Sequence, residues 1–256
     1  MSKKGFSIII AVWNQLGYTR LTVDSIMRMS GDVPYEFVIV DNGSLPAVKA
    51  YFDSIKANGS VAYIRNEKNV GPIKAINQGI AASKYDYVMV IHNDVVIMED
   101  GWLSKIACIM DRDPSIGLAG LAGRKEIYAT GCVNEASLVH NLQNEDLNAP
   151  MKDESAEVAV LDGLCFVMRR EFIDKIKGLD EVYGYMHCYD LDISLQSREA
   201  GFKNVVINVE AMHIGNGGRT RKAGEYKDLV KDDYGLLKRN CKIFSEKWRH
   251  VLPVKV

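Results

Sequence analysis

The sequence has no apolar run long enough to cross a membrane, no cysteine motif and almost no net charge. A bilayer-spanning helix needs about 18–20 apolar residues, and the first apolar segment, residues 6–12, is also too short for a signal peptide. A net charge of −1 gives no reason to expect a nucleic-acid partner. The five cysteines are an odd number without CxxC spacing, which predicts reduced thiols in a cytoplasmic protein rather than disulfides or a zinc site.

Two further absences narrow the fold and the function. The sequence shows no internal repeat, low-complexity segment or flexible linker, so its 256 residues fit one large domain or two small ones. The first predicted strand runs into Ala11-Val12-Trp13-Asn14 and not into GxGxxG, the glycine-rich turn that binds dinucleotides. This difference counts against a dehydrogenase.

Short apolar strands alternate with amphipathic helices through the first hundred residues. We predict strands at 6–12, 35–40, 61–65 and 86–91, and helices at 16–29, 46–57 and 72–82. Such alternation predicts an α/β fold with a parallel sheet, helices on both faces and right-handed crossovers. A helix at 102–111 and strands at 116–121 and 205–209 follow, whereas residues 123–155 read either as a long irregular loop or as a small hairpin.

The fourth predicted strand stops abruptly at His92-Asn93-Asp94, and apolar character resumes at Val95. A carboxylate at the mouth of a buried strand is costly to desolvate unless a hydrogen-bond donor or a metal pairs with it. Ligands of open α/β sheets bind outside the carboxyl ends of the strands. Asp94 is therefore a candidate for the chemistry, although the same residues could simply form a turn.

Asp41 follows the second predicted strand, so it should lie on the same edge of the sheet as Asp94. A carboxylate there could accept hydrogen bonds from a base or a ribose. However, Asp41-Asn42-Gly43-Ser44 consists entirely of turn-forming residues, and taken alone it favours a turn.

A third candidate is the start of the helix predicted at 72–82. Gly71 stands at the helix entry, and Lys74 and Asn77 are three residues apart, so they share a helix face. Because a helix N-terminus favours an anion, this arrangement suits a diphosphate. The alternative is an ordinary capped helix with a surface lysine.

These segments closely resemble the GT-A fold glycosyltransferases of family 2, in the rhamnosyltransferase-like branch of inverting enzymes. The resemblance rests on the order and spacing of Asp41-Asn42-Gly43-Ser44, then Asn69-Val70-Gly71 with Ala75, Asn77 and Gly79, then Asn93-Asp94-Val95. In that family the triplet after the fourth strand is Asp-x-Asp, and its last Asp binds a divalent metal. The resemblance therefore implies a metal at Asp94 and donor contacts at Ala11, Asn14, Asp41, Gly71, Lys74, Asn93 and Asp94. His92 replaces the family's first Asp, which leaves one carboxylate where the family has two.

The resemblance continues in the second half, where the stretch from Asp162 to Arg170 is similar to a glycine-rich segment that lines the sugar and acceptor pocket. Asp190 matches the family's catalytic base, and Tyr189 stands in the place of the Glu that precedes it. His213 lies where the family places a metal-binding histidine, and its nitrogen would favour Mn²⁺. A lone histidine could equally be structural, and acids such as Asp192 in a first helical turn also offset the helix dipole.

The final segment, residues 219–256, reads as a tail with a helix at 225–250. Apolar residues recur on one face of this helix at spacings of three and four: Tyr234, Leu237, Cys241, Phe244 and Trp248. Residues 219–249 hold ten Lys or Arg against five Asp or Glu, so the helix could contact an anionic membrane or a second subunit to form a homodimer. Packing on the chain's own core is the favoured interpretation. The turn Asn216-Gly217-Gly218-Arg219 is expected to form part of a lid over the donor.

Together these features predict an inverting glycosyltransferase that uses Mn²⁺ or Mg²⁺. It would pass a sugar from a UDP-, dTDP- or GDP-sugar to a hydroxyl of a glycan, a lipid-linked acceptor or a protein, in the cytoplasm or peripherally at the inner face of the membrane. Residues 1–218 would form the GT-A domain, with a nucleotide-binding half at 1–100 and an acceptor and catalytic half at 101–218. The alternatives are a sugar nucleotidyltransferase and a catalytically silent sugar-nucleotide-binding module.

Overall fold

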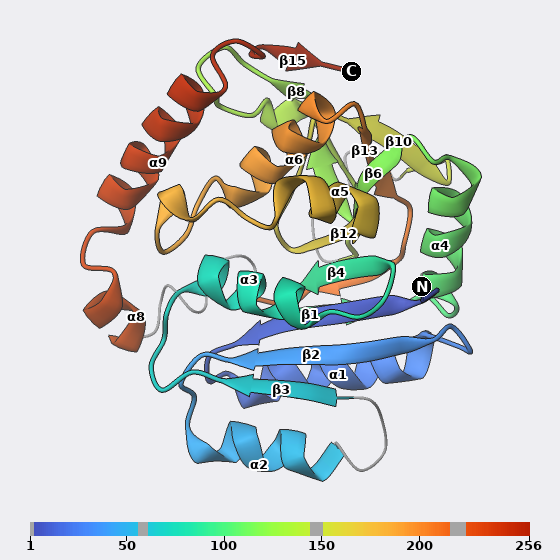
Figure 1. Cartoon of the computed structure of the whole chain (residues 1–256), viewed down its shortest axis with the longest axis vertical. Coiled ribbons are helices and arrows are strands. Elements are labelled where there is room, and N and C mark those ends of the chain that lie inside the picture. The colour runs from blue at the N-terminus through green and yellow to red at the C-terminus, as the bar shows by residue number, and fades with distance from the viewer. Residues whose placement is uncertain (1–2, 56–60, 144–150, 216–223) are drawn as a thin grey trace.

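The computed structural model describes residues 3–55, 61–143, 151–215 and 224–256, which fold around one eight-stranded sheet (Figure 1). The strand order is β10-β13-β6-β12-β4-β1-β2-β3. The strands are β1 (Phe6–Val12), β2 (Tyr35–Asp41), β3 (Val61–Arg65), β4 (Tyr87–Ile91), β6 (Ile116–Gly120), β10 (Ser155–Val158), β12 (Cys165–Arg169) and β13 (Lys203–Ile207).

The first half of the sheet is parallel, because β1 pairs with both β2 and β4, and β2 pairs with β3. Helices cover both faces. One core contains residues of α1 (Leu16–Met29), α2 (Pro46–Ile55) and α4 (Trp102–Arg112). The other contains residues of α3 (Pro72–Ala82), α5 (Arg170–Ile176) and α6 (Tyr189–Glu199). The predicted α/β fold is confirmed.

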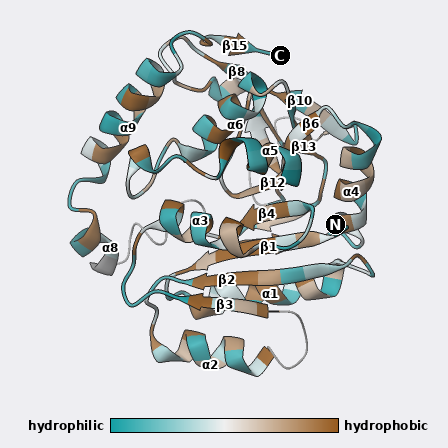
Figure 2. Cartoon of the chain, in the orientation of Figure 1, coloured by the Kyte–Doolittle hydropathy of each residue, from teal (hydrophilic) through white to brown (hydrophobic). Residues whose placement is uncertain are grey.

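Alternation along β1 decides which side chain enters which core. Ile8 and Ile10 belong to the core under α1 and α2, whereas Ile9 between them belongs to the core under α3. Gly79 lets α3 approach closely, since a Cβ there would lie 2.5 Å from Cγ2 of Ile9. A strand buried on both faces reads as a continuous apolar run, and Figure 2 shows the apolar colour concentrated in these central strands.

The second half of the sheet is mixed. β12 runs antiparallel between β4 and β6, β13 is parallel to β6, and β10 is antiparallel to β13. Because β12 is reversed, its first residue, Cys165, pairs with Ile91 at the last residue of β4. The amide of His92 then donates to the carbonyl of Leu164 at 2.8 Å. The reversal thus brings the residues before β12 to the edge of the sheet where β4 ends.

Residues 123–155 contain more structure than an irregular loop. In a small antiparallel sheet, β7 (Ala122–Arg124) lies between β9 (Leu138–His140) and β11 (Val160–Leu161). Along the chain, β8 (Glu126–Ile127) and the 3-10 helix η2 (Glu135–Ser137) come between β7 and β9. Of the two interpretations of this segment, the hairpin is therefore the better one, within 123–143 and 151–155. Strands of two or three residues are too short to show an alternating pattern, so the sequence could not locate them.

The prediction of a single helix at 225–250 is wrong, because the structure has two helices there, α8 (Gly224–Leu229) and α9 (Asp233–Lys247). The carboxylate of Asp232 accepts from the amide of Gly235 at 2.8 Å and caps the N-terminus of α9. Phe244 and Trp248 are buried, whereas Tyr234 is 66% exposed. The C-terminal half of α9 therefore packs on the chain's own core, as favoured from the sequence.

The remaining elements complete the frame of the site. β5 (Val95–Ile97) pairs antiparallel with β14 (Ala211–His213), η3 (Glu181–Tyr183) precedes α6, and β15 (Val254–Lys255) pairs with β8. Within the ranges that the structure describes, no helix is both long enough and apolar enough to span a bilayer. The predicted lid turn, 216–219, lies outside the described residues.

Candidate active site

A pocket of about 610 Å³ opens where β1 and β4 end. Its floor comes from the ends of these strands, and one wall comes from the segment between β11 and β12 and the start of α6. Three residues of the C-terminal helices, Tyr226, Leu237 and Cys241, complete another wall. The pocket thus lies at the edge that the strand pattern predicted for a ligand.

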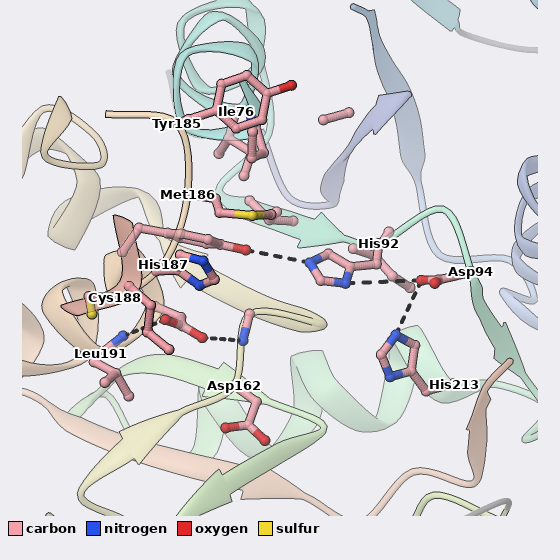
Figure 3. A pocket seen from close by; sticks show the side chains of 18 of the residues that line it. Ile76, His92, Asp94, Asp162, Tyr185, Met186, His187, Cys188, Leu191 and His213 are labelled. Atoms are coloured by element: carbon pink, nitrogen blue, oxygen red, sulfur yellow. Dashed lines mark hydrogen bonds and ion pairs between the residues drawn. The ribbon is translucent and has the colours of Figure 1, made fainter. Parts of the chain in front are cut away.

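Two histidines and a carboxylate meet on one side of this pocket (Figure 3). Nε2 of His213 lies 3.3 Å from Oδ1 of Asp94, and Nδ1 of His92 lies 4.0 Å from the same oxygen. Antiparallel pairing of β5 with β14 sets this geometry, because it places His213 directly opposite Val95. The three possible ligand atoms lie within 4.8 Å of one another, close enough to share one metal ion.

The electrostatics of the cluster keep the Asp94 carboxylate ionised. Burial alone would raise the pKa of Asp94, but the hydrogen bond from His213 and the charges of both histidines outweigh it and hold the pKa below its ordinary value. Asp94 therefore stays ionised with Oδ1 buried between two imidazole rings. Two nitrogens and one oxygen suit a first-row divalent ion such as Mn²⁺ better than Mg²⁺, which prefers oxygen ligands.

Gly215, which follows β14, closes tightly over the carboxylate of Asp94. A Cβ at this position would lie 1.7 Å from Oδ2 of Asp94. The amide of Ile214 donates to the Asp94 carbonyl at 2.9 Å and fixes the approach. A side chain larger than hydrogen at residue 215 would therefore force either the carboxylate or the chain after β14 to move.

Asp190 lies on the other side of the pocket, in the first turn of α6. Its Oδ2 accepts from the amide of Gly163, and its Oδ1 accepts from the amide of Leu191, both at 3.0 Å. Burial and the nearby charge of Asp162 raise the pKa of Asp190 to about 6, while these amides oppose the rise. A carboxylate with this pKa is mainly ionised at pH 7 and still accepts a proton readily, which suits a general base.

The backbone before α6 is unusual and aims the helix start at the pocket. His187 and Cys188 have φ angles of 73° and 61°, a region that residues with side chains rarely adopt. Such conformations persist only where the surrounding structure enforces them, and they cluster at functional sites. Here they turn the chain so that Tyr189 and Asp190 both face Gly163, whose added Cβ would lie 2.5 Å from Oη of Tyr189 and 3.2 Å from Oδ2 of Asp190.

The predicted donor contacts divide into two groups. Ala11, Asn93 and Asp94 line the pocket together with Asp190 and His213. Asn93 is held in place by a hydrogen bond from its Nδ2 to Oγ1 of Thr19 at 3.0 Å.

The second group, Asn14, Asp41, Gly71 and Lys74, is not part of the pocket lining in the described residues. The Asp41 carboxylate is fully buried and accepts from Arg65 and Tyr63. Gly71 caps α3, and Nζ of exposed Lys74 lies 4.0 Å from Glu181. Asn14 accepts from the Leu45 amide through Oδ1 at 2.8 Å. Their donor roles stay predictions.

The sequence does not single out Asn42 or Arg124 as site residues, yet both line the pocket. Asn42 lies in the predicted turn, and it lines the pocket while its Nδ2 donates to the Gly71 carbonyl at 3.1 Å. Arg124 lines the opposite wall, where it pairs with Asp162 and with Glu135 at 2.6 Å. This cluster becomes visible only when β7 and β11 pair, because its members are far apart in the chain.

Comparison with solved structures defines the class as the GT-A fold. A structure of GalNAc-T7 with UDP, GalNAc and Mn²⁺ has a TM-score of 0.68 at 18% identity, covering 82% of this chain and 43% of that one. A structure of the mannosyltransferase PcManGT from Pyrobaculum calidifontis with GDP-Man and Mn²⁺ has a TM-score of 0.61 at 14% identity, covering 98% and 71%. At these identities the likeness shows the fold alone.

The sequence itself gives the family. Residues 7–177 match the sequence model of glycosyl transferase family 2, and the chain belongs to this family. An uncharacterized protein, y4gI, of Sinorhizobium fredii (strain NBRC 101917 / NGR234) is 28% identical over 214 residues, which cover 78% of this chain and 23% of that protein. The chain thus matches about a quarter of the length of this relative.

Proposed function

We propose that the chain is an inverting, metal-dependent glycosyltransferase that transfers a sugar from a nucleotide diphosphate sugar to an acceptor hydroxyl. The observation that carries the proposal is that one pocket holds a carboxylate with a pKa of about 6, Asp190, and a separate cluster of two histidines and Asp94. Structures of related fold contain UDP with GalNAc, or GDP-Man, together with Mn²⁺, which supports a nucleotide-sugar donor and a divalent ion.

The base performs the first part of the chemistry. An acceptor hydroxyl within hydrogen-bond reach of Asp190 would lose its proton to this carboxylate as the oxygen attacks the anomeric carbon. The amides of Gly163 and Leu191 hold both carboxylate oxygens, so Asp190 keeps one orientation. Attack in line with the departing nucleotide diphosphate inverts the configuration at that carbon.

The histidine–carboxylate cluster serves the leaving group. A divalent ion bound to His92, Asp94 and His213 would neutralise charge on the departing diphosphate. Ala11 and Asn93, which line the pocket beside this cluster, would contact the nucleotide.

The acceptor would approach from the other wall. There Asp162, Arg124 and Glu135 form a paired cluster beside Asp190, and such groups bind hydroxyls through directed hydrogen bonds. We propose residues 1–100 as the donor half and 101–218 as the acceptor half, with a glycan, a lipid-linked glycan or a protein as the acceptor at the cytoplasmic side.

Two measurements test the proposal. A thermal-shift screen of UDP, dTDP, GDP and their sugars with Mn²⁺ should reveal a stabilising donor, because a ligand that binds the folded state raises its stability. Incubation with that donor and candidate acceptors should then release nucleoside diphosphate and form a product of inverted anomeric configuration. In a parallel incubation, release of pyrophosphate from a nucleoside triphosphate and a sugar 1-phosphate would indicate a nucleotidyltransferase, and donor binding without turnover would indicate a silent binding module; either result contradicts the proposal.

A further inference from the structure

Two residues that differ from the family pattern contact each other in the pocket. His92 and Tyr189 both stand where the resemblance predicts an acid, and they are 97 positions apart in the chain. Even so, Oη of Tyr189 lies 3.4 Å from Nε2 of His92. The other ring nitrogen of His92, Nδ1, faces Oδ1 of Asp94 at 4.0 Å. The imidazole thus bridges the hydroxyl and the carboxylate cluster.

The hydroxyl of Tyr189 packs closely against Gly163. Tyr189 is 9% exposed and belongs to the core between the sheet and α6. Its Oη rests against Gly163, where a Cβ would approach it to 2.5 Å. The amide of the same glycine binds Asp190. One residue without a side chain therefore seats both the hydroxyl that faces His92 and the carboxylate of the base.

A neutral imidazole has one N–H and one lone pair, and a hydrogen bond at one nitrogen fixes which atom carries the proton. We propose that Tyr189 is a positioning residue for His92: its oxygen accepts the Nε2 proton, so that Nδ1 presents its lone pair to a divalent ion shared with Asp94 and His213. This inference rests on the metal site of the proposed function. It assigns the chain a ligand set of two nitrogens and one oxygen, which prefers Mn²⁺ to Mg²⁺.

Groups that orient a metal-bound histidine typically change metal affinity about 10–100-fold when they are removed. Tyr189→Phe deletes only the hydroxyl and keeps the buried ring. In Mn²⁺ titrations without nucleotide, read by the electron paramagnetic resonance of free Mn²⁺, we expect this variant to bind at least about tenfold more weakly than the wild type. Tyr185→Phe is the matched control, because Tyr185 lines the same pocket but packs against Tyr226 and not against His92; its Mn²⁺ affinity should not change.

A double-mutant cycle shows whether the hydroxyl acts through the imidazole. His92→Ala should weaken Mn²⁺ binding by itself, and adding Tyr189→Phe to that variant should cause no further loss. Thermal unfolding checks that each variant is folded. Wild-type affinity in Tyr189→Phe would overturn the assignment, as would an equal loss of affinity in the His92→Ala background. Absence of Mn²⁺ binding by the wild type would instead refute the metal site itself, and the assignment with it.

Discussion

At the scale of single residues, the environment of Asp190 sets its chemistry. Burial and the charge of Asp162 work against ionisation, and two backbone amides work for it, so that the pKa settles at about 6. An ordinary exposed Asp, with a pKa of about 4, would be a weaker base at neutral pH. The amides also prevent the carboxylate from turning away, so the same contacts control both its basicity and its direction.

The pH dependence of transfer should follow from this pKa. Because Asp190 must be ionised to accept a proton, kcat/KM should fall about tenfold per pH unit below pH 6 and level off above it. Asp190→Asn should reduce kcat by about 10²–10⁴-fold while leaving nucleotide binding, measured by calorimetry, nearly unchanged. Full activity of this variant, or a falling limb that persists in its residual activity, would refute the base assignment.

The cluster of His92, Asp94 and His213 shows what a residue pattern can and cannot predict. Asp94 and His213 were candidates from the sequence, and the structure brings them to within 3.3 Å. The sequence marks His92 only as a missing acid, because the approach of His213 to it depends on β5 pairing with β14, which each have three residues. The sequence predicts Asp41 as a donor contact; in the structure its Oδ2 accepts from Arg65 and Tyr63 and its Oδ1 accepts from the Ser44 amide at 2.8 Å, partners that a one-dimensional pattern cannot show.

Gly215 offers a separate test of the cluster. Gly215→Ala places a methyl group on Oδ2 of Asp94, so either the carboxylate or the chain after β14 must move. We expect Mn²⁺ affinity to fall by about tenfold or more, as for loss of an orienting contact. Gly17→Ala is the matched control, because Gly17 has no positive φ angle and no atom lies within 4 Å of an added Cβ there. Equal Mn²⁺ affinity in both variants would show that the contact is unimportant.

At the scale of elements, α9 is fixed to α6 through a buried carboxylate. Asp192 Oδ1 accepts from Nε1 of Trp248 and from Oη of Tyr183, both at 2.7 Å, and lies 2.8 Å from Nζ of Lys247. From the sequence alone, Asp192 has two equal interpretations, a functional role and a structural one, in which a first-turn acid offsets the helix dipole. Of these partners Tyr183 lies in η3, and Lys247 and Trp248 are 55 and 56 residues away in the chain. The contact therefore could not be predicted locally.

Removing one partner of this carboxylate should lower stability. Trp248→Phe keeps an aromatic ring but deletes the donor, and loss of a buried hydrogen bond to a charged group costs about 1–3 kcal/mol of unfolding free energy. Tyr234→Phe, at the exposed start of the same helix, is the control and should change it by less than about 0.5 kcal/mol. Urea denaturation measures both. A Trp248→Phe variant as stable as the control would show that Asp192 does not fix α9.

At the scale of the whole molecule, the long apolar strands and the amphipathic helices were predictable, and the short segments between them were not. Helices 16–29 and 72–82 coincide with α1 and α3, since their apolar residues repeat over several turns. The short strands around Arg124 and the break before α9 rest on pairings and caps of two to four residues. Many of the residues that line the pocket lie in such short segments. For this reason its position at the edge of the sheet could be predicted, but not its full lining.

The position of α8 and α9 has a consequence for biosynthesis. One wall of the pocket consists of Tyr226, Leu237 and Cys241. The indole of Trp248, at the end of α9, donates to the carboxylate of Asp192 in α6. These residues leave the ribosome after every strand of the eight-stranded sheet has emerged. While translation is under way, the emerging chain can pair its sheet, but the pocket still lacks this wall. We therefore expect the proposed sugar transfer to require docking of α8 and α9.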